Sequence, residues 1–288
     1  MNKRNLGIIY TVSSALIYGF VPIICALSYY YGNNAFSLTF FRSFITLPIF
    51  GLICLRKNIN LKISLSDFIH LLMVSFFGIV IAVFLLYLSY NYIGVGSATT
   101  LHFLYPLFVM MIAHLIYHDK ISAKQKKALF LAMIGIAFFF DYRDLNKLLG
   151  VVIALLSGVC FSIYIIGLDK FRLSKMDNYK LSFYLSLNVV VIMGVINLFV
   201  KQIIFNQPLN SYIYILIVAL LAQFIGLIMF KMGVDYLGGA EAAILSLFEP
   251  VSAVIFGVLF LGERVSLPQI VGCLFIIVGV LLLVRKKV

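Results

Sequence analysis

Long apolar stretches alternate with short polar segments along the whole chain. Ten of these stretches approach the length of about 20 residues that an α-helix needs to cross a bilayer. Helices are favoured over strands because the apolar runs are continuous and because lipid leaves backbone polar groups no external partners. The pattern predicts ten transmembrane helices, near residues 6–29, 35–55, 67–90, 97–117, 124–140, 147–168, 179–200, 211–234, 241–261 and 266–284.

Composition agrees with a chain that is embedded in lipid. Hydrophobic residues make up 64% of the 288 positions and charged residues 11%, whereas a soluble domain carries about 25% charged residues. Most of the 22 Lys and Arg residues fall in the segments that share a side of the predicted membrane with the N-terminus. The positive-inside rule therefore places both termini in the cytoplasm. Membrane topology also explains the net charge of +12. Because the charge has this explanation, it does not indicate a nucleic-acid partner.

An internal repeat divides the chain into two halves. Residues 92–122 align with residues 236–266 without a gap, and the alignment pairs Pro106 with Pro250. Each half holds five predicted spans, and because five is an odd number the second half must be inserted upside down relative to the first. We expect an all-α integral membrane fold of two inverted five-helix repeats, with domains at residues 1–140 and 147–288.

Several short motifs resemble those of one known family. Gly262-Glu263-Arg264-Val265-Ser266 follows the ninth predicted span, Phe248-Glu249-Pro250 lies within that span, and Arg42 lies in the second. In their order and spacing these motifs resemble the ten-helix EamA-type branch of the drug/metabolite transporter superfamily. The resemblance implies a substrate cavity at the centre of the bundle, between the halves. The chain departs from the family at His118, which stands where a glycine is usual, and it has no tryptophan.

Glu249 is the clearest candidate for a functional group. An ionisable residue deep in a span costs roughly 2.5–3.5 kcal/mol on insertion scales, so it is expected to face a cavity or a partner. On helical spacing Glu249 shares a small and polar face with Ala242, Ser246 and Ala253, which is unsuited to lipid. We expect Glu249 to bind a substrate amine or to carry a proton, with Ser246 in the same site. The alternative is a structural acid that is hydrogen-bonded to a neighbouring helix.

The two paired prolines are expected to interrupt the backbone hydrogen bonding of their helices. Pro106 and Pro250 lack the amide donors that would reach the carbonyl groups of His102 and Ser246. Freed carbonyl groups near the middle of the membrane are typical of transporter binding sites and gates. The alternative is a simple kink that shapes helix packing.

Three further polar residues lie within predicted spans. His102 stands opposite Ser246 in the repeat, and we expect it either to bind substrate or carry protons, or to pack as a hydrogen-bonded histidine. Arg42 is expected to snorkel to the interface or to pair with an acid, with substrate binding as a third role. Lys231 is expected to snorkel, with a role in the cavity as the alternative.

A few aromatic residues are expected to face the centre of the bundle rather than the lipid. The small-residue pairs Ala15/Gly158 and Gly19/Ser162 occupy matching positions in the two halves and allow close helix approach. Aromatic side chains beside them are suited to stacking on an organic solute or to attracting its cation, and packing is the alternative. Tyr18 and Phe161 lie beside these pairs, and the other aromatic residues expected at the centre are Tyr87, Tyr90, Tyr105 and Tyr164.

These features favour a secondary transporter. The leading hypothesis is export of a small organic metabolite, such as an amino acid or amine, by alternating access through a central cavity. Import of a small solute through the same fold is the alternative. Segments 91–97 and 235–241 are expected to be the alternating gates, and coupling to protons is a further hypothesis. The predicted location is the inner membrane of a bacterium, crossed many times by the chain.

Other functional classes lack their motifs in this sequence. No P-loop glycine motif occurs, which argues against transport driven directly by a nucleotide. Neither Gly-x-Ser-x-Gly nor His-Glu-x-x-His occurs, so a membrane enzyme is disfavoured. A non-transporting partner subunit is the third hypothesis. The four cysteines have no metal-ligand spacing, so neither a metal nor a cofactor is expected.

Overall fold

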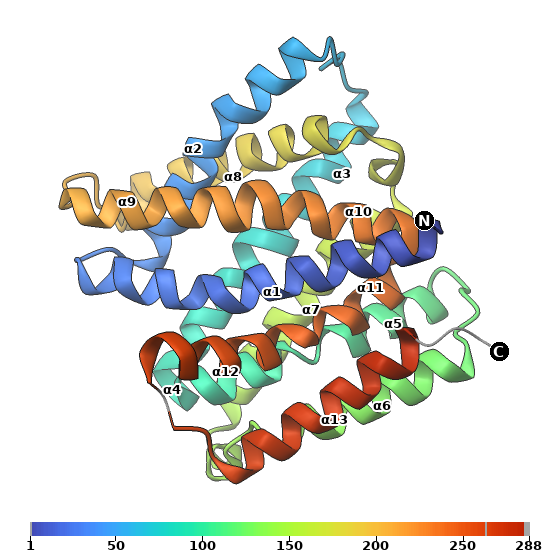
Figure 1. Ribbon diagram of the computed structural model, residues 1–288. Helices are drawn as coiled ribbons and strands as arrows, with labels where there is room; N and C mark the ends of the chain where they lie inside the picture. The colour runs from blue at the N-terminus through green and yellow to red at the C-terminus, as the bar shows by residue number, and fades with distance from the viewer. Residues whose placement is uncertain (1, 263, 285–288) are drawn as a thin grey trace.

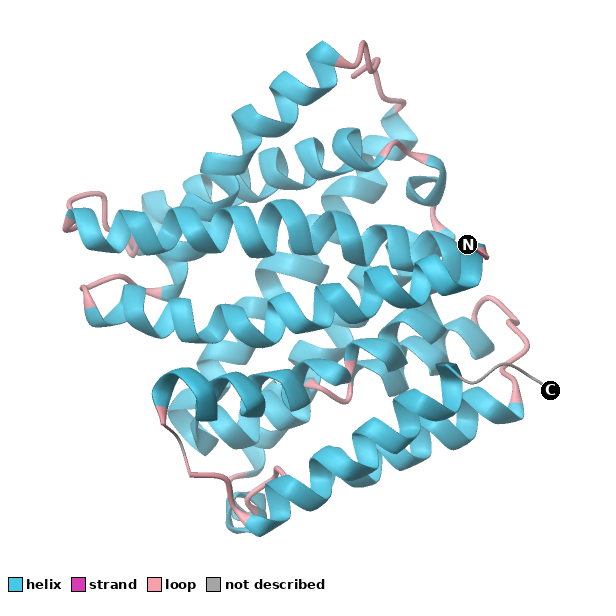
Figure 2. Ribbon diagram, viewed as in Figure 1, coloured by secondary structure: helices cyan, strands magenta, loops and turns pink. Residues whose placement is uncertain are grey.

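A computed structural model describes residues 2–262 and 264–284 of the chain. Those residues form a bundle of α-helices in which no β-strand occurs (Figures 1 and 2). Two π-helical segments, η1 (Phe76–Ile81) and η4 (Ala219–Gly226), join α3 to α4 and α9 to α10. The helices are α1 (Lys3–Tyr30), α2 (Ala35–Arg56), α3 (Leu65–Ser75), α4 (Ala82–His102), α5 (Tyr105–Leu115), α6 (Ala123–Ala137), α7 (Leu148–Lys170), α8 (Asn178–Val200), α9 (Leu209–Val218), α10 (Leu227–Leu237), α11 (Gly239–Ser246), α12 (Phe248–Leu261) and α13 (Leu267–Val284).

The predicted spans agree closely with the observed helices. Within the part of the chain that the structure describes, nine helical segments are long and apolar enough to cross a membrane. The remaining prediction, residues 124–140, corresponds to α6, which has 15 residues and ends at Ala137. A helix of that length spans about 22 Å, less than the hydrocarbon core of about 30 Å. The tenth crossing therefore stays a prediction.

Polar residues define the starts of several helices. The Asn34 side chain accepts a hydrogen bond from the Ser37 amide at the start of α2. Ser122 and Gln125 form a reciprocal capping box at the start of α6. Such caps satisfy amide groups that have no partner within the helix, and they fix where each helix begins.

The packing of α6 against α13 sets the direction of the second half. A Cβ atom on Gly135 of α6 would lie 2.6 Å from the Gly272 carbonyl oxygen of α13, so the two backbones are in close contact. Lys124, at the start of α6, donates a hydrogen bond to the Leu283 carbonyl at the end of α13, so the two helices are antiparallel. Arg4 of α1 also donates to Leu283. Helix α6 therefore begins where α1 begins, and α7 starts at the opposite end.

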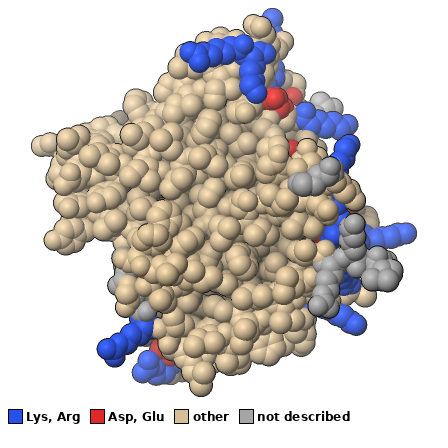
Figure 3. Space-filling model, in the orientation of Figure 1, with Lys and Arg blue, Asp and Glu red and all other residues tan. Residues whose placement is uncertain are grey.

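Helices α1 and α7 consequently run in opposite directions, as inverted repeats require. We call the end that contains Arg4 and Leu283 the terminal end, and the other the far end. Lys and Arg side chains gather along the terminal end, and a smaller group lies at the far end (Figure 3).

Helix contacts obey the same twofold relation. Helix α1 packs against α10 and α12, and its counterpart α7 packs against α4 and α5. The counterpart pairs α2 with α8 and α6 with α13 also contact each other. The largest buried cluster joins α3, α5, α7, α8, α10 and α11 at the centre of the bundle.

Two glycines show this symmetry at the level of single residues. A Cβ atom on Gly7 of α1 would lie 2.8 Å from the Cβ atom of Tyr236. A Cβ atom on Gly150 of α7 would lie 2.5 Å from the Cβ atom of Tyr92, the repeat partner of Tyr236. The absence of a side chain at these positions lets each helix approach its neighbour in the other half.

The predicted loop over residues 91–97 is wrong, because α4 stays helical through it. The chain nevertheless reverses there. Gly78 lies against Tyr164 of α7 and Tyr92 lies against Gly150 at the start of α7, so up to Tyr92 the chain runs antiparallel to α7. His102 lies against Gly158 in the middle of α7, so after Tyr92 the chain runs parallel to α7. Residues 91–97 carry no charge, so the helix itself satisfies their backbone groups best.

The equivalent segment, residues 235–241, is also a tight turn rather than a loop. Helix α10 ends at Leu237, and α11 begins at Gly239. The single residue between them, Gly238, has a φ of +80°, which L side chains rarely adopt. Neither predicted gate is therefore a loop: residues 91–97 are helical, and residues 235–241 contain a connection of one residue.

The π-helical segments were not predicted, although they occupy equivalent positions in the two repeats. A π-turn widens the helix and leaves carbonyl groups without their usual partners. In η4 two of these groups accept hydrogen bonds from α1: Tyr18 donates to the Ala222 carbonyl at 3.2 Å, and Ser14 donates to the Gly226 carbonyl at 3.0 Å. The irregular backbone of η4 thereby anchors α1 across the boundary between the halves.

Candidate functional site

The helix interruptions predicted at the two prolines are present. Helix α4 ends at His102 and α5 begins at Tyr105, and α11 and α12 are separated by Leu247 alone. At each break the backbone tightens, with the Leu104 amide donating to the Leu101 carbonyl at 3.1 Å and the Leu247 amide to the Ile244 carbonyl at 3.2 Å. Pro106 and Pro250 lie in the first turns of the helices that follow.

Glu249 lies in the first turn of α12, directly after the break. Helices α1 and α12 meet closely at this point, since a Cβ atom on Gly19 would lie 2.7 Å from the Glu249 carbonyl oxygen. The Glu249 side chain is half-buried. No residue described in the structure gives its carboxyl group a hydrogen bond or an ion pair. The structural role considered above, an acid bonded to a neighbouring helix, is therefore not the observed arrangement.

Arg42 of α2 is also without a partner. Its Nε atom is buried and unbonded, and no described carboxylate lies within ion-pair distance of its guanidinium group. The predicted pairing with an acid is thus wrong for this conformation. The guanidinium group lies within electrostatic range of Tyr18, Tyr29, Tyr87 and Tyr164. At least the Nε atom of Arg42 is therefore enclosed by the bundle, while the residue as a whole is half-buried.

Four of the predicted site residues form one aromatic cluster. The Phe161 ring centroid lies 5.3 Å from that of His102, 4.9 Å from that of Tyr105 and 5.6 Å from that of Tyr164. The cluster continues to Phe230 of α10, 6.2 Å from Tyr164. Because its members come from α4, α5, α7 and α10, the cluster bridges the two halves.

His102 is held by a specific hydrogen bond. Its Nδ1 atom lies 2.9 Å from Ser157 Oγ, and Ser157 donates its own proton to the Ala154 carbonyl. Since a hydroxyl group has one proton to donate, Nδ1 must be the donor to Ser157. In the neutral ring this tautomer leaves Nε2 as a free acceptor.

Tyr18 is close to both unpartnered charges. Its ring is within electrostatic range of both Arg42 and Glu249. Tyr105 approaches Glu249 from the first half and also faces Ser246. Ser246 is buried and donates to the Ala242 carbonyl of its own helix, so its hydroxyl proton is already used.

Lys231 does not snorkel, contrary to the sequence interpretation. Its side chain is only 2% exposed and forms an ion pair with Asp235, one turn further along α10. The i,i+4 spacing of this pair was visible in the sequence. Because the charge is neutralised locally, Lys231 is not available to a solute in this conformation.

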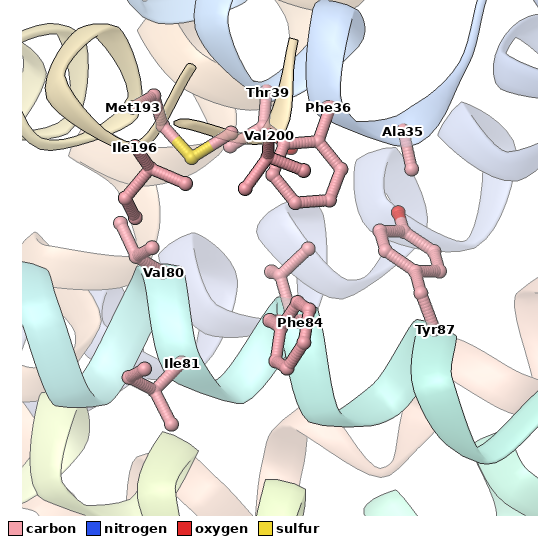
Figure 4. A pocket seen from close by; sticks show the side chains of 11 residues that line it. Ala35, Phe36, Thr39, Val80, Ile81, Phe84, Tyr87, Met193, Ile196 and Val200 are labelled. Carbon is pink, nitrogen blue, oxygen red and sulfur yellow. The ribbon is translucent and has the colours of Figure 1, made fainter. Parts of the chain in front are cut away.

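Tyr87 lies at the edge of an apolar cavity of about 230 Å³ between α2, η1, α4 and α8 (Figure 4). Phe36, Phe84 and Met193 line it (Figure 4). Tyr87 lies close to Tyr29, a residue that the sequence reasoning missed. Tyr29 lies three helical turns after Tyr18 on the same face of α1, which is the signal that would have found it.

Comparison with known proteins agrees with this geometry. Residues 5–140 and residues 148–285 each match the description of the EamA-like transporter family. The chain belongs to the EamA-like transporter family. The predicted membership of the drug/metabolite transporter superfamily is thereby confirmed.

Relatives of this EamA-family protein have been given transporter names. An uncharacterized transporter from Clostridium kluyveri is 22% identical over 76% of this chain and 73% of its own length. An uncharacterized transporter from Archaeoglobus fulgidus is 25% identical over 67% of this chain and 68% of its own. One solved crystal structure has a TM-score of 0.80 at 13% identity and covers 96% of both chains, which shows a shared fold. The family and its relatives point to a transporter rather than an enzyme.

The EamA-family chain carries polar contacts at equivalent positions of its two ends. At the terminal end, Arg4 forms an ion pair with Glu241 at 2.6 Å. At the far end the repeat partners of these residues are Lys147 and Ser97, and both bind Asp144, at 2.8 and 2.6 Å. We call these contacts the terminal latch and the far latch. The terminal latch joins α11, at the start of predicted span 9, to α1, the first helix of the first half. The far latch joins the start of predicted span 4 to the start of α7, the first helix of the second half.

The far latch of the EamA-family protein predicts a pH dependence. Hydrogen bonds from Lys147 and Ser97 lower the pKa of Asp144 below its usual 3.8. A carboxyl whose pKa is lowered by folding stabilises the fold above its unfolded pKa, and this contribution disappears as pH falls through the folded pKa. We expect Asp144→Asn to lower the melting temperature slightly at neutral pH. The difference should shrink as pH falls below 3.8 and vanish once the pH is below the lowered pKa of Asp144.

Thermal unfolding of the purified protein in detergent measures this effect. Ser97→Ala, which removes one of the two partners of Asp144, should give a smaller loss with the same pH profile. If the difference in melting temperature between wild type and Asp144→Asn is unchanged in acid, the lower melting temperature does not come from loss of this carboxylate.

Within the described residues, no group of three or more His, Cys, Asp or Glu side chains is placed to hold a metal ion. All four cysteines are free. The chemistry available at the centre of the bundle is therefore that of a carboxyl, a guanidinium, an imidazole and several phenol groups.

Proposed function

We propose that this EamA-family protein is a secondary transporter that exports a small organic metabolite, such as an amino acid or amine, by alternating access. The observation that carries the proposal is the Glu249 carboxyl group, which has no partner among the described residues at the break between α11 and α12. An ionisable group held inside a bundle of apolar helices at an energetic cost marks a substrate or ion pathway. The aromatic cluster around Phe161 supplies a surface for the organic part of the solute.

The inverted repeats support alternating access between two sides. The two units proposed are residues 1–140 and 147–288, and the site lies between them. The helical segment 91–97 and the tight turn within residues 235–241 act as gates, and Pro106 and Pro250 act as the joints beside the site. Opening one latch while the other stays closed would expose the site to one side of the membrane at a time.

Orientation and coupling belong to the same proposal. The concentration of Lys and Arg at the terminal end favours placing that end in the cytoplasm of a bacterial cell (Figure 3). Glu249 and His102 are the groups that would carry a proton, since both lie at the central site and neither is tied into an ion pair.

Flux through proteoliposomes tests the proposal. The purified protein is reconstituted, and counterflow is measured for radiolabelled L-amino acids, amines, nucleosides and sugars. We expect at least one class to move faster than in protein-free vesicles, and Glu249→Gln to slow it at least about tenfold, by loss of a charged contact. Cells that express the protein should also lose the preloaded solute faster than cells that express the variant. Absence of flux for every solute would contradict the proposal, and faster cellular uptake instead of loss would reverse its direction.

A further inference from the structure

An apolar groove opens on the side of the bundle near its far end. It is the cavity of about 230 Å³ beside Tyr87, and in Figure 4 the side chains of η1 and α4 point across it toward those of α2 and α8. Val80 and Met193 on its inner wall are buried, whereas Phe84 and Val200 on its rim are 44% and 45% exposed. None of the residues that line it carries a charge. We call this cavity the lateral groove.

The lateral groove lies at the depth of one lipid leaflet. Its mouth is at the far end, where α2 starts at Ala35 and α8 ends at Val200. From Val200 to Met193 a helix advances about 10 Å, which is less than half of a hydrocarbon core of about 30 Å. The helical segments that bound the groove are each long and apolar enough to cross a membrane. An occupant that enters from the far leaflet therefore meets apolar surface only.

The chain itself fills the related place in the other repeat. Helix α8 packs against η1 just as its counterpart α2 packs against η4. In the second contact Phe50 of α2 is fully buried, and its ring centroid lies 5.2 Å from that of Phe224 in η4. Met193 and Val80 stand within one residue of the positions that the repeat pairs with Phe50 and Phe224. A flexible and a small side chain thus replace two packed rings, and the lateral groove is the space that they leave.

Lys201 supplies a positive charge at the mouth of the lateral groove. It follows Val200 directly, is exposed and forms no ion pair with any described residue. The segment that carries it is held beside the start of α2, because the Asn34 side chain donates to the Gln202 carbonyl at 2.8 Å. An ammonium group at this level of the membrane attracts the phosphate of a lipid headgroup.

We propose that the lateral groove binds one acyl chain of an anionic glycerophospholipid, whose phosphate is held by Lys201. The acyl chain restores to Val80 and Met193 the dispersion contacts that an empty groove forfeits. A helix from a second copy of the protein is about 10–12 Å across and needs several times the volume of the groove. A free apolar molecule would leave Lys201 unpaired. This lipid site lies apart from the aromatic cluster and does not depend on the proposed transport activity.

Quenching by brominated lipid tests the proposal, because the chain contains no tryptophan. Phe84→Trp places a single reporter at the rim, where bromine atoms on a bound acyl chain quench its fluorescence by contact. The purified full-length variant in detergent is titrated with brominated phosphatidylglycerol. We expect quenching that saturates. Val191→Trp, on a face of α8 that is 54% exposed and outside the groove, should show only a loss proportional to lipid. Proportional loss at both positions would overturn the proposal.

Filling the groove separates binding there from general contact with lipid. The double variant Val80→Phe/Met193→Phe introduces the ring pair of the related place, and Ala35→Phe narrows the mouth instead. With Phe84→Trp as reporter, each should raise the lipid concentration for half-maximal quenching at least about tenfold, through loss of methylene burial. Val195→Phe on the exposed face of α8 is the matched control and should change nothing. Unchanged quenching in both filled variants, with symmetric elution profiles, would overturn the proposal.

Lys201→Asn tests the contact with the headgroup. Lys201 has a φ of +52°, which asparagine tolerates, so the backbone is kept. We expect about fivefold weaker binding of brominated phosphatidylglycerol and unchanged binding of brominated diacylglycerol, which lacks the phosphate. Arg143→Gln is the control, because Arg143 is a far-end cation that is 91% exposed and outside the groove. Equal effects on both lipids would overturn the phosphate contact. Dimers in detergent that Val80→Phe/Met193→Phe disperses would show a second copy in the groove and overturn the lipid site.

Discussion

Gly19→Ala is expected to lower the transport rate at least tenfold and to destabilise the protein by about 1–3 kcal/mol. A Cβ atom at Gly19 would lie 1.9 Å from Ser252 Oγ, 2.7 Å from the Glu249 carbonyl oxygen and 2.8 Å from the Ala253 amide nitrogen. Two of these three atoms belong to the backbone, so no rotation of a side chain relieves the overlap. Helices α1 and α12 must move apart at the point where Glu249 enters the site.

The separation would also break a hydrogen bond across the boundary between the halves. Ser252 donates to the Ala15 carbonyl at 3.1 Å, and this bond depends on the close approach at Gly19. We therefore expect the loss of transport to accompany a lower melting temperature. Both are measured on the same purified protein, by counterflow and by thermal unfolding.

Gly194→Ala is the matched control for this change. Gly194 lies within α8, and apart from its own helix turn no described atom lies within 4 Å of the position that its Cβ atom would take. Alanine is favoured over glycine inside a helix by about 1 kcal/mol, so this variant should be as stable as wild type or slightly more stable. If Gly19→Ala behaves like Gly194→Ala in both measurements, the α1–α12 contact does not shape the site.

Cross-linking either end of the bundle is expected to abolish transport completely. Alternating access requires each end to open once in a cycle, so a covalent bridge at one end traps the protein. In a background without the four native cysteines, the pair Arg4→Cys and Glu241→Cys replaces the terminal latch. The pair Ser97→Cys and Lys147→Cys replaces the far latch. A bifunctional, reducible thiol reagent should stop counterflow in both, and reduction should restore it.

The control cross-link is placed within one capping box. Ser122→Cys and Gln125→Cys stand three residues apart at the start of α6, and a bridge between them does not join the two halves. This pair, and each single cysteine treated with the same reagent, should keep its flux. Persistent flux after complete cross-linking of either latch would show that its end does not open during transport.

Much of the architecture is determined by the sequence alone, because lipid imposes strict local rules. A span must be long, apolar and internally hydrogen-bonded, so nine of the predicted spans recur as helices of sufficient length within the described residues. The breaks beside Pro106 and Pro250 follow from the missing proline amide, which is a property of one residue. The small-residue pairs likewise placed Tyr18 and Phe161 near the centre, since close helix approach depends on side-chain size.

The failures of the sequence interpretation concern contacts between residues that are distant in the chain. No local pattern shows that Arg42 lacks an acid, because this depends on which helices surround it. The π-helical segment η4 has no local signal of this kind, because the carbonyl groups that it frees accept hydrogen bonds from α1, a helix distant in the chain. The helical conformation of residues 91–97 was missed for a related reason. The chain reverses there through contacts with α7, which is distant in the chain, and not through a polar loop.

The sequence by itself therefore determined the membrane class, the family, nine of the helical spans and the duplicated halves. It also supplied the candidates Glu249, His102 and the aromatic residues. The tertiary structure decided which of the intramembrane charges are neutralised, as Lys231 is by Asp235, and which remain vacant, as Arg42 and Glu249 do. The physical reason is that apolar length and backbone hydrogen bonding act along the chain, whereas charge compensation depends on side chains that only packing brings together.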